Sequence, residues 1–235
     1  MDMKKILTLF VIGLATGLIT ASAQLPQLSQ KENRQGWILL FDGKTTAGWQ
    51  KSNGQPFPEK GWKIENGVLS VDPSNGRGGD IVTSEKFADF ELSLEFKLTR
   101  GANSGIKYFV FDHTSLGCEF QILDDQVHPD AKLGINGNRL QGGLYDLIAP
   151  EKGKKDMPVG SWNSARIISK GKHVEHWLNG KKVVEYERGG DLFQQLVAGS
   201  KYKKENGFGT IESSPILLQD HGDSVSFRNI KIRKL

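Results

Sequence analysis

Apolar and polar residues alternate with a period of two along much of this chain. Between Phe90 and Leu98 every second residue is apolar, and the positions between them are Glu, Ser, Glu and Lys. Because successive side chains of a strand point to opposite faces of a sheet, this pattern predicts a strand with one face in a core. Two more segments predict hairpins, since each contains an Asn-Gly pair, which tight hairpin turns favour. They are Trp62–Glu65 with Val68–Val71 around Asn66-Gly67, and His173–Leu178 with 181–186 around Asn179-Gly180.

Shorter apolar runs complete the pattern, and helical periodicity is nearly absent beyond the first two dozen residues. The runs cover 106–111, Cys118–Leu123, 215–219 and 225–232, and residues 191–198 favour one short helix. Many short strands with glycine-rich turns predict an all-β sandwich or barrel. No internal repeat is present and the length suits one domain. We therefore expect a flexible polar leader at 24–36 and a single domain at 37–235.

The first 23 residues have the features of a secretory signal peptide. Lys4 and Lys5 precede a largely apolar run at 6–19, and Ala21-Ser22-Ala23 supplies the small residues of a cleavage site. The run is shorter than the ~20 residues that cross a bilayer, which argues against a permanent anchor. We expect cleavage after Ala23 and a periplasmic or secreted protein. The sole cysteine, Cys118, lies far from this site, so no lipid attachment or membrane anchor is expected after cleavage.

Composition narrows the classes of partner. The formal net charge is +4, and basic residues gather at 152–155 and 201–204, where we interpret them as solvated loops. No motif that reads nucleic acid accompanies them, so nucleic-acid binding is not expected. A single cysteine cannot form an internal disulfide, and Cys118 is expected to be a buried, unreactive thiol.

The stretch from Ala102 to Asp146 is rich in polar groups that a structural loop would not need. Alternation in the strand after Gly117 places Phe120 and Ile122 in the core, with Glu119 and Gln121 about 7 Å apart on the opposite face. Amide and carboxylate pairs bind sugar hydroxyls, an arginine binds an electron-rich oxygen, and aromatic rings stack on sugar rings. This mixture predicts a carbohydrate site on the outer face of a curved sheet.

Ordered motifs along nearly the whole chain after the leader carry a resemblance to a known family. They are Leu40-Phe41-Asp42-Gly43-Lys44 with Gly48-Trp49, Asn103-Ser104-Gly105-Ile106, 119–125, His128-Pro129-Asp130, Gly137-Asn138-Arg139, Leu144-Tyr145-Asp146, Glu175-His176-Trp177-Leu178-Asn179-Gly180, Ser200-Lys201-Tyr202, Leu217-Leu218-Gln219-Asp220-His221-Gly222 and Phe227-Arg228-Asn229-Ile230. With them the chain resembles the DUF1080 family, described as 3-keto-glucoside 1,2-lyase, 3-keto-2-hydroxyglucal hydratase and 3-keto-disaccharide hydrolase. The resemblance implies a concanavalin A-like jelly-roll β-sandwich, a 3-keto sugar as substrate and a periplasmic setting.

The chemistry of such a substrate indicates which groups the site needs. A ketone at C3 acidifies the C2 proton, a base removes it, and the enolate expels the C1 substituent to leave a 3-keto-2-hydroxyglucal, to which water can add. This route needs a base that titrates near working pH, an acid and preorganised donors, and the paired carboxylates of ordinary glycosidases are not obligatory. The chain has no nicotinamide-binding signature. A separate glycoside 3-dehydrogenase is therefore expected upstream to install the ketone.

The five histidines are the natural acid–base candidates. His128 and His221 are predicted to be catalytic, because each lies in a polar matching segment beside a carboxylate, Asp130 or Asp220, that could orient the ring. His176 alternates with core residues, so either a substrate contact or a satisfied core histidine fits it. The other two, His113 and His173, are interpreted as surface residues.

Arg139 and Glu119 complete the predicted catalytic set. Arg139 is expected to bind the ketone or enolate oxygen with its permanently charged fork, the alternative being a structural ion pair with Asp124 or Asp125. Glu119 is expected to act as acid or base, or to bind a hydroxyl. The predicted substrate-binding residues are Gln121, Asp124, Asn103, Asn138, Tyr145, His176, Lys201 and Gln219.

No cofactor is firmly predicted, although a divalent metal would suit an enediolate. Oxygen and nitrogen ligands could come from Glu119, Asp124, His128 and His221, but no close His-x-His or His-x-x-x-His spacing is present. We assign no metal ligand from the sequence.

Three functions compete at this point. They are a lyase or hydratase of 3-keto-glucosides, a direct hydrolase of 3-keto-disaccharides, and a non-catalytic carbohydrate-binding module. A binding module needs aromatic and amide side chains but no cluster of His, Arg and acidic residues, so the 119–146 segment favours an enzyme. Fold class alone does not separate the three.

Overall fold

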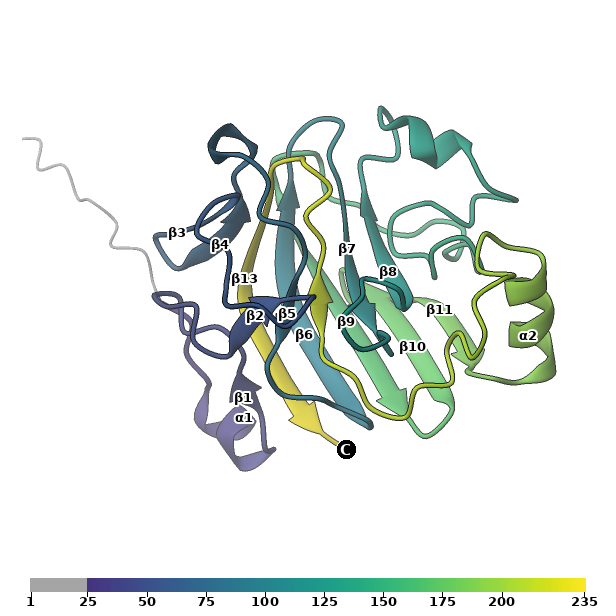
Figure 1. Ribbon diagram of the computed structural model, residues 1–235, viewed down its shortest axis with the longest axis horizontal. Coiled ribbons are helices and arrows are strands. Elements are labelled where there is room, and N and C mark those ends of the chain that lie inside the picture. The colour runs from purple at the N-terminus through teal and green to yellow at the C-terminus, as the bar shows by residue number, and fades with distance from the viewer. Residues whose placement is uncertain (1–24) are drawn as a thin grey trace, which may run out of the picture.

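The computed structural model describes residues 25–235 and has two antiparallel β-sheets packed face to face (Figure 1). The larger sheet has the strand order β11 (Lys181–Glu187), β10 (His173–Leu178), β9 (Trp162–Lys170), β6 (Phe90–Leu98), β13 (Val225–Lys234), β4 (Val68–Val71) and β3 (Trp62–Glu65), with β1 (Ile38–Leu39) paired to β13. The smaller sheet has the order β2 (Trp49–Lys51), β5 (Ile81–Thr83), β12 (Leu217–Leu218), β7 (Asn103–Tyr108) and β8 (Cys118–Leu123). The all-β, concanavalin A-like jelly-roll sandwich is thereby confirmed.

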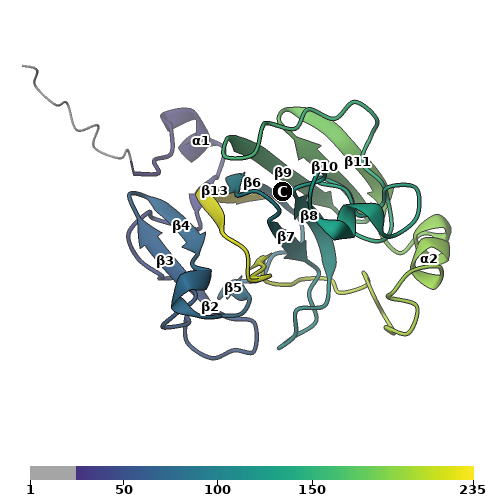
Figure 2. The same cartoon turned by 90° about the horizontal axis from the view of Figure 1, so that it is seen from above.

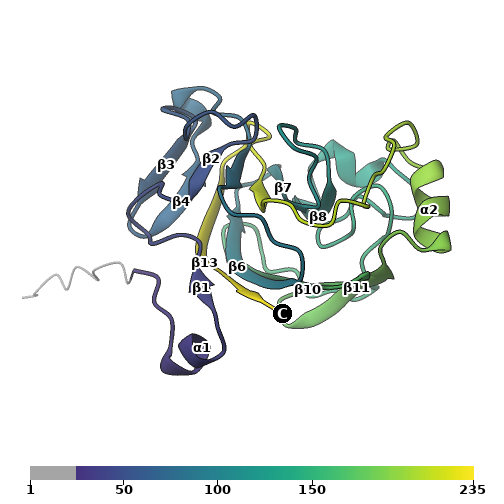
Figure 3. The ribbon, with the colours of Figure 1, turned by 60° about the horizontal axis from the view of Figure 1, so that its bottom comes forward.

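Within residues 25–235 the helices are few and lie outside the sandwich. They are α1 (Gln30–Arg34), α2 (Asp191–Ala198) and two 3-10 turns, η1 (Pro73–Asn75) and η2 (Pro129–Lys132). Figures 2 and 3 show α2 at the side of the molecule opposite to β3 and β4. The bounds of α2 confirm the short helix predicted at 191–198.

Both predicted hairpins are confirmed, and their turns show why the Asn-Gly pairs were informative. Asn66 and Gly67 have φ of 51° and 77°, and Asn179 and Gly180 have φ of 49° and 78°. Positive φ at both central residues is the requirement of the I′ turn, whose twist matches that of the flanking strands. Each hairpin adds two strands to an edge of the larger sheet.

The core lies between the two sheets and is built from the alternate residues that the period-two pattern predicted. From the larger sheet Leu94 and Phe96 are buried, and from the smaller sheet Ile106 and Phe120 are buried with them. Cys118 belongs to the same core, fully buried, and burial raises the pKa of its thiol to about 12. The expectation of a buried cysteine is confirmed.

Strand ends differ from the prediction in one place that matters for the site. The expected strand at 106–111 begins earlier, at Asn103, and ends at Tyr108. Phe109 has φ of 50°, a left-handed conformation that interrupts the pleat and ends the strand. The shift brings Asn103 into the sheet. The long strand β9 and the two- and three-residue strands β1, β2 and β5 were not predicted.

The expected flexible leader is wrong for the part of it that the structure describes. Helix α1 starts with a capping box, in which Ser29 and Glu32 satisfy each other's backbone N–H groups. Glu32 also pairs with Lys231 of β13, and this contact, with the bond from Ser29, lowers the Glu32 pKa to about 2. These contacts dock the segment on the larger sheet. The predicted signal peptide at 1–23 lies outside the described residues, and within 25–235 no helix is both long and apolar enough to cross a membrane.

Candidate active site

The outer face of the smaller sheet carries a group of polar side chains where β7, β8 and β12 meet. In the register of β7 and β8, Lys107 lies opposite Glu119 and Gly105 lies opposite Gln121, while Phe120 pairs with Ile106 on the core side. We call Asn103, Lys107, Glu119, Gln121 and Gln219 the polar face. Gln219 continues β12 and donates its backbone N–H to Gly105 O at 3.0 Å. The predicted placement of Glu119 and Gln121 away from the core is confirmed.

Glu119 is held in place by its neighbours on this face. Its Oε2 lies 3.4 Å from Lys107 Nζ, and the Gln121 amide, oriented to satisfy both of its partners, donates to Glu119 Oε1 at 3.3 Å. The carboxylate lies over Gly105, where a Cβ atom would come within 2.2 Å of Oε1. Glu119 is only 4% exposed, so Gly105 supplies the space that this buried carboxylate needs.

A second group, centred on Lys201, flanks the polar face. Tyr145 donates its backbone N–H to Glu119 O at 3.0 Å, which places its ring beside β8. Lys201 Nζ lies 4.1 Å from the centre of that ring, and the Lys201 backbone N–H donates to Asp146 Oδ2 at 2.8 Å. Partial burial lowers the pKa of Lys201, and the charge of Glu119 opposes this shift. In the described part of the chain the ammonium has no carboxylate within ion-pair distance.

Arg139 has a different immediate role from the one predicted. Its Nε donates to Asp146 Oδ1 at 2.6 Å and its Nη1 donates to Asp130 Oδ1 at 2.8 Å. The guanidinium therefore joins the loop after β8 to the residue that anchors Lys201. The alternative partners Asp124 and Asp125 are also wrong. Arg139 is a positioning residue here, whereas Lys201 beside it has no carboxylate partner among the described residues.

The two predicted catalytic histidines come together. His128 precedes η2 and His221 follows β12, yet their ring centres are 6.1 Å apart. Nitrogens of both rings and an oxygen of Asp223 lie within 4.8 Å of one another. The Asp223 carboxylate also accepts the backbone N–H of Asn103 at 3.0 Å, which ties this histidine pair, His128 and His221, to the polar face.

Asp130 and Asp220, the carboxylates predicted to orient these rings, have other partners. Both oxygens of Asp220 accept backbone N–H groups, from Gly78 and Gly79 at 3.0 and 2.9 Å and from Gly222 at 2.9 Å. The Asp130 side chain is directed to Arg139. Asp223 is the carboxylate beside both histidines.

The prediction of His176 as a substrate contact is wrong. Its ring is fully buried between the sheets, where Tyr108 Oη lies 2.6 Å from Nε2 and Gly142 O lies 3.1 Å from Nδ1. Burial lowers its pKa to about 4, so it is neutral near pH 7. It is a satisfied core histidine, the alternative that the alternation pattern left open.

Two more predicted contacts serve the loops that follow β8. Asp124 accepts the backbone N–H of Gly101 at 2.8 Å and of Gln126 at 3.1 Å. Asn138 accepts the backbone N–H of Ile135 at 2.9 Å. Both side chains use these oxygens to shape the loops, so we do not count them in the polar face.

The four metal ligands considered from the sequence are not brought together. Asp124 binds backbone N–H groups and Glu119 pairs with Lys107. The nearest alternative is His128 with His221 and Asp223. However, His128 Nδ1 already accepts a backbone N–H, whereas a metal-bound imidazole normally donates from its second nitrogen. This set therefore does not fit a metal ion well.

Three residues of the site were missed, although each had a signal in the sequence. Lys107 lies two residues after Gly105, on the same side of the alternating strand. Asp146 ends the motif that begins at Leu144, and Asp223 lies two residues after His221. Their roles depend on partners that are distant in the sequence, so the local pattern did not single them out.

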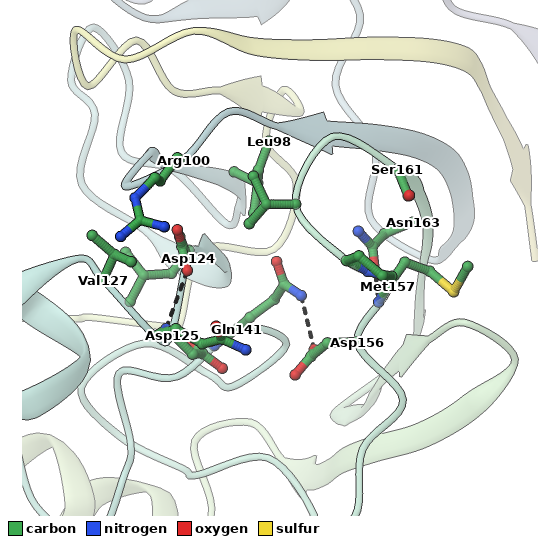
Figure 4. Close-up of a pocket in the computed structure, with 14 residues that line it drawn as sticks. Leu98, Arg100, Asp124, Asp125, Val127, Gln141, Asp156, Met157, Ser161 and Asn163 are labelled. Carbon is green, nitrogen blue, oxygen red and sulfur yellow. Dashed lines mark hydrogen bonds between the residues drawn. The ribbon is translucent and has the colours of Figure 1, made fainter.

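A cavity of about 400 Å³ opens at the end of the sandwich, next to the loop that leads to His128 (Figure 4). Leu98 and Val127 give it apolar walls, and the Gln141 amide donates to Asp156 Oδ1 at 2.8 Å beside it. Asp124 lines this cavity rather than the polar face. Because no residue of the polar face or the histidine pair lines it, we treat it as separate from the site.

Comparisons with known proteins agree with this architecture. The chain matches the family of the 3-keto-alpha-glucoside-1,2-lyase-like domain over residues 36–233. A protein of Bacteroides thetaiotaomicron named 3-keto-disaccharide hydrolase is 34% identical over 91% of this chain and 83% of its own length. A crystal structure from Parabacteroides distasonis, of a protein provisionally named a glycosyl hydrolase, has 30% identity and a TM-score of 0.79 over 90% of this chain and 100% of that one.

More distant structures share the fold alone. A carbohydrate-binding module from Bacillus subtilis has 10% identity and a TM-score of 0.51 over 80% of this chain and 96% of its own. The family match covers the two sheets, the polar face and the histidine pair together. The chain therefore belongs to the family of 3-keto-alpha-glucoside-1,2-lyase-like domains.

Proposed function

We propose that this protein is a carbohydrate-active enzyme that cleaves 3-keto-glucosides by removing the C2 proton and expelling the C1 substituent. It would also hydrate the resulting 3-keto-2-hydroxyglucal. The observation that carries the proposal is that two imidazoles, with ring centres 6.1 Å apart, lie next to the polar face in a chain that belongs to this family. An imidazole can take up and release a proton, which suits removal of a proton beside a ketone.

The carboxylates around the site support an elimination rather than the usual glycosidase route. That route needs two carboxyl groups on either side of the scissile bond, one as acid and one as base or nucleophile. Glu119 is paired with Lys107, and Asp130 and Asp146 are paired with Arg139. These three carboxylates are committed to cations. Lys201 and His128 have no ion-pair partner among the described residues, and His221 faces Asp223 at 4.0 Å.

The remaining groups fit the needs of a sugar ring and its developing charge. Gln219 is half-buried and offers an amide group for a hydroxyl, and the buried amides of Gln121 and Asn103 lie on the same face. Lys201 offers a cation for an oxygen that becomes negative, and its ammonium is exposed, so a substrate can reach it. Burial and the nearby Asp130 carboxylate raise the pKa of Tyr145, so its hydroxyl stays protonated and can donate.

The purified protein is expected to cleave a 3-keto-glucoside and to leave the matching unoxidised glucoside intact. The reason is that only the 3-ketone acidifies the C2 proton. Release of the aglycone from both compounds is measured by chromatography under the same conditions. Comparable turnover of the unoxidised glucoside would refute the proposal.

Direct hydrolysis is the second candidate, favoured by the name of the Bacteroides thetaiotaomicron relative. The same reaction in heavy water separates the two. Elimination followed by hydration places deuterium at C2 of the free 3-keto sugar, whereas direct hydrolysis leaves hydrogen there. Mass spectrometry of the product, quenched before the ketone exchanges in solution, reads the difference.

Replacing Gly105 with alanine is expected to lower kcat/KM about 10²-fold, since a displacement of ~1 Å in the groups that position a substrate has an effect of this size. The new Cβ would lie 2.2 Å from Glu119 Oε1 and would force the carboxylate to move. Gly190→Ala is the matched control, because its Cβ would meet its nearest neighbour at 3.4 Å, an ordinary contact. Initial rates with the 3-keto-glucoside test this, and equal rates in the two variants would contradict the role of Gly105.

The proposal extends to the setting of the enzyme. The signal-like N-terminus predicts action after export. A separate glycoside 3-dehydrogenase is expected to supply the substrate, because the elimination needs a ketone that is already on the sugar ring. Fractionation of the native host with an antibody to this chain tests the location. Retention of residues 1–23 on the mature protein would contradict it.

A further inference from the structure

The backbone next to His128 determines which of its nitrogens carries a proton. His128 stands at the N-terminal end of η2, and its Nδ1 accepts the backbone N–H of Asp130 at 3.1 Å. Pro129 holds the first position of the turn, where its fixed φ favours this geometry. The bond is local and does not depend on the rest of the site.

A nitrogen that accepts an N–H must present its lone pair. If Nδ1 were protonated, two N–H groups would face each other at 3.1 Å and the bond to Asp130 would be lost. The neutral ring then has its single proton on Nε2, so Nε2 is a donor and has no lone pair to accept one. A histidine in this state can polarise an oxygen but cannot remove a proton with Nε2.

His221 has the opposite environment. Its Nδ1 faces Asp223 Oδ2 at 4.0 Å, and Asn103 fixes that oxygen by a backbone N–H bond of 3.0 Å. A carboxylate beside Nδ1 favours the proton on Nδ1, which leaves the Nε2 lone pair free, and it stabilises the imidazolium that forms later. His221 is exposed, so a substrate can reach it. Asp223 is the carboxylate within 4.8 Å of both rings.

We infer that the two histidines have opposite roles: His221, oriented by Asp223, is the base, and His128 is a neutral N–H donor to the enolate oxygen. This inference rests on the proposed elimination. His221 Nε2 takes the C2 proton, and the C2–H electron pair forms the C2=C3 double bond. The charge moves to the C3 oxygen, which accepts a hydrogen bond from the His128 Nε2–H. The enolate oxygen then reforms the C3 ketone, the C2=C3 electron pair forms the C1=C2 double bond, and the C1–O bond breaks. The departing oxygen takes the proton from His221. Atoms and charge balance without another reactant.

The protonation state of His128 can be read without any substrate. Long-range ¹H–¹⁵N correlation spectra of the ¹⁵N-labelled protein at pH 7.5 distinguish the two neutral tautomers from the imidazolium. Spectra of His128→Gln and His221→Gln assign the two rings. We expect His128 as the Nε2–H tautomer and His221 as the Nδ1–H tautomer. An Nδ1–H tautomer or an imidazolium at His128 would overturn the assignment.

The pH profile of kcat/KM with a 3-keto-glucoside tests the division of roles. A base that must be unprotonated produces a fall on the acid side of the profile. His128→Gln is expected to lower the whole profile about 10²-fold and to keep the acid limb, since the donor is lost and the base remains. His221→Gln is expected to lose the acid limb. His113→Gln, at an exposed histidine away from the site, is the matched control and should retain the wild-type profile.

The outcomes separate this inference from the proposed function. Loss of the acid limb in His128→Gln with its retention in His221→Gln would reverse the roles and overturn the inference while leaving the elimination intact. If no 3-keto-glucoside is cleaved, the proposed function fails, and the spectra still decide the tautomers.

Discussion

Replacing Lys201 with methionine is expected to lower kcat/KM for a 3-keto-glucoside about 10²- to 10³-fold, the usual effect of removing one donor to a developing oxyanion. The Lys201 ammonium lies over the Tyr145 ring, and no carboxylate in the described residues forms an ion pair with it. Methionine keeps the length of the side chain and removes the charge. Steady-state kinetics measure the loss.

The neighbouring lysine provides the control for this prediction. Lys203→Met removes an exposed positive charge from the same loop and should keep the wild-type kcat/KM. Chemical denaturation should show that Lys201→Met loses no more than about 1 kcal/mol, the value of an exposed cation–π contact. Equal rates in the two variants would show that Lys201 only packs against Tyr145.

Stability is expected to fall by up to about 3 kcal/mol between pH 6.5 and pH 4 because of His176 alone. The folded-state pKa of this buried ring is about 4, below the usual value of 6.5. Between these two pH values the unfolded chain binds a proton that the folded chain does not. The free energy of unfolding therefore rises with pH across this window. The contribution of the neutral His176 to stability is lost as the pH falls from 6.5 to 4.

Urea denaturation of the wild type and of His176→Gln at several pH values isolates this contribution. Glutamine keeps a polar group near Tyr108 and Gly142 but does not titrate. The difference in the free energy of unfolding between the two proteins should shrink as the pH falls from 6.5 to 4.5. A difference that stays constant would show that His176 is already protonated in the folded protein.

Much of the architecture followed from short-range patterns. The alternation from Phe90 to Leu98 predicted one strand and the two Asn-Gly turns predicted two hairpins, and the structure confirms all of them. The same alternation placed Glu119 and Gln121 away from the core. In the leader, the Ser29–Glu32 capping box was a local signal for the helix that we missed, whereas its docking depends on Lys231, almost at the other end of the chain.

His176 shows what such short-range patterns cannot predict. Alternation put it on the face of Val174 and Leu178, yet a polar ring at such a position can be a ligand contact or a core residue. The choice depends on a partner for its buried nitrogen. Tyr108 supplies one from 68 residues away, and no local pattern could predict that contact.

The charged partners of the site were decided in the same way. Asp223, rather than the adjacent Asp220, serves His221, because Asp220 binds backbone N–H groups some 140 residues away. Asp146 fixes Lys201 across 55 residues. Backbone conformation and the face on which a side chain lies depend on neighbours within a few positions, so they could be read directly from the order of residues. Which acid meets which base depends on how distant loops pack, and that became known only from the folded molecule.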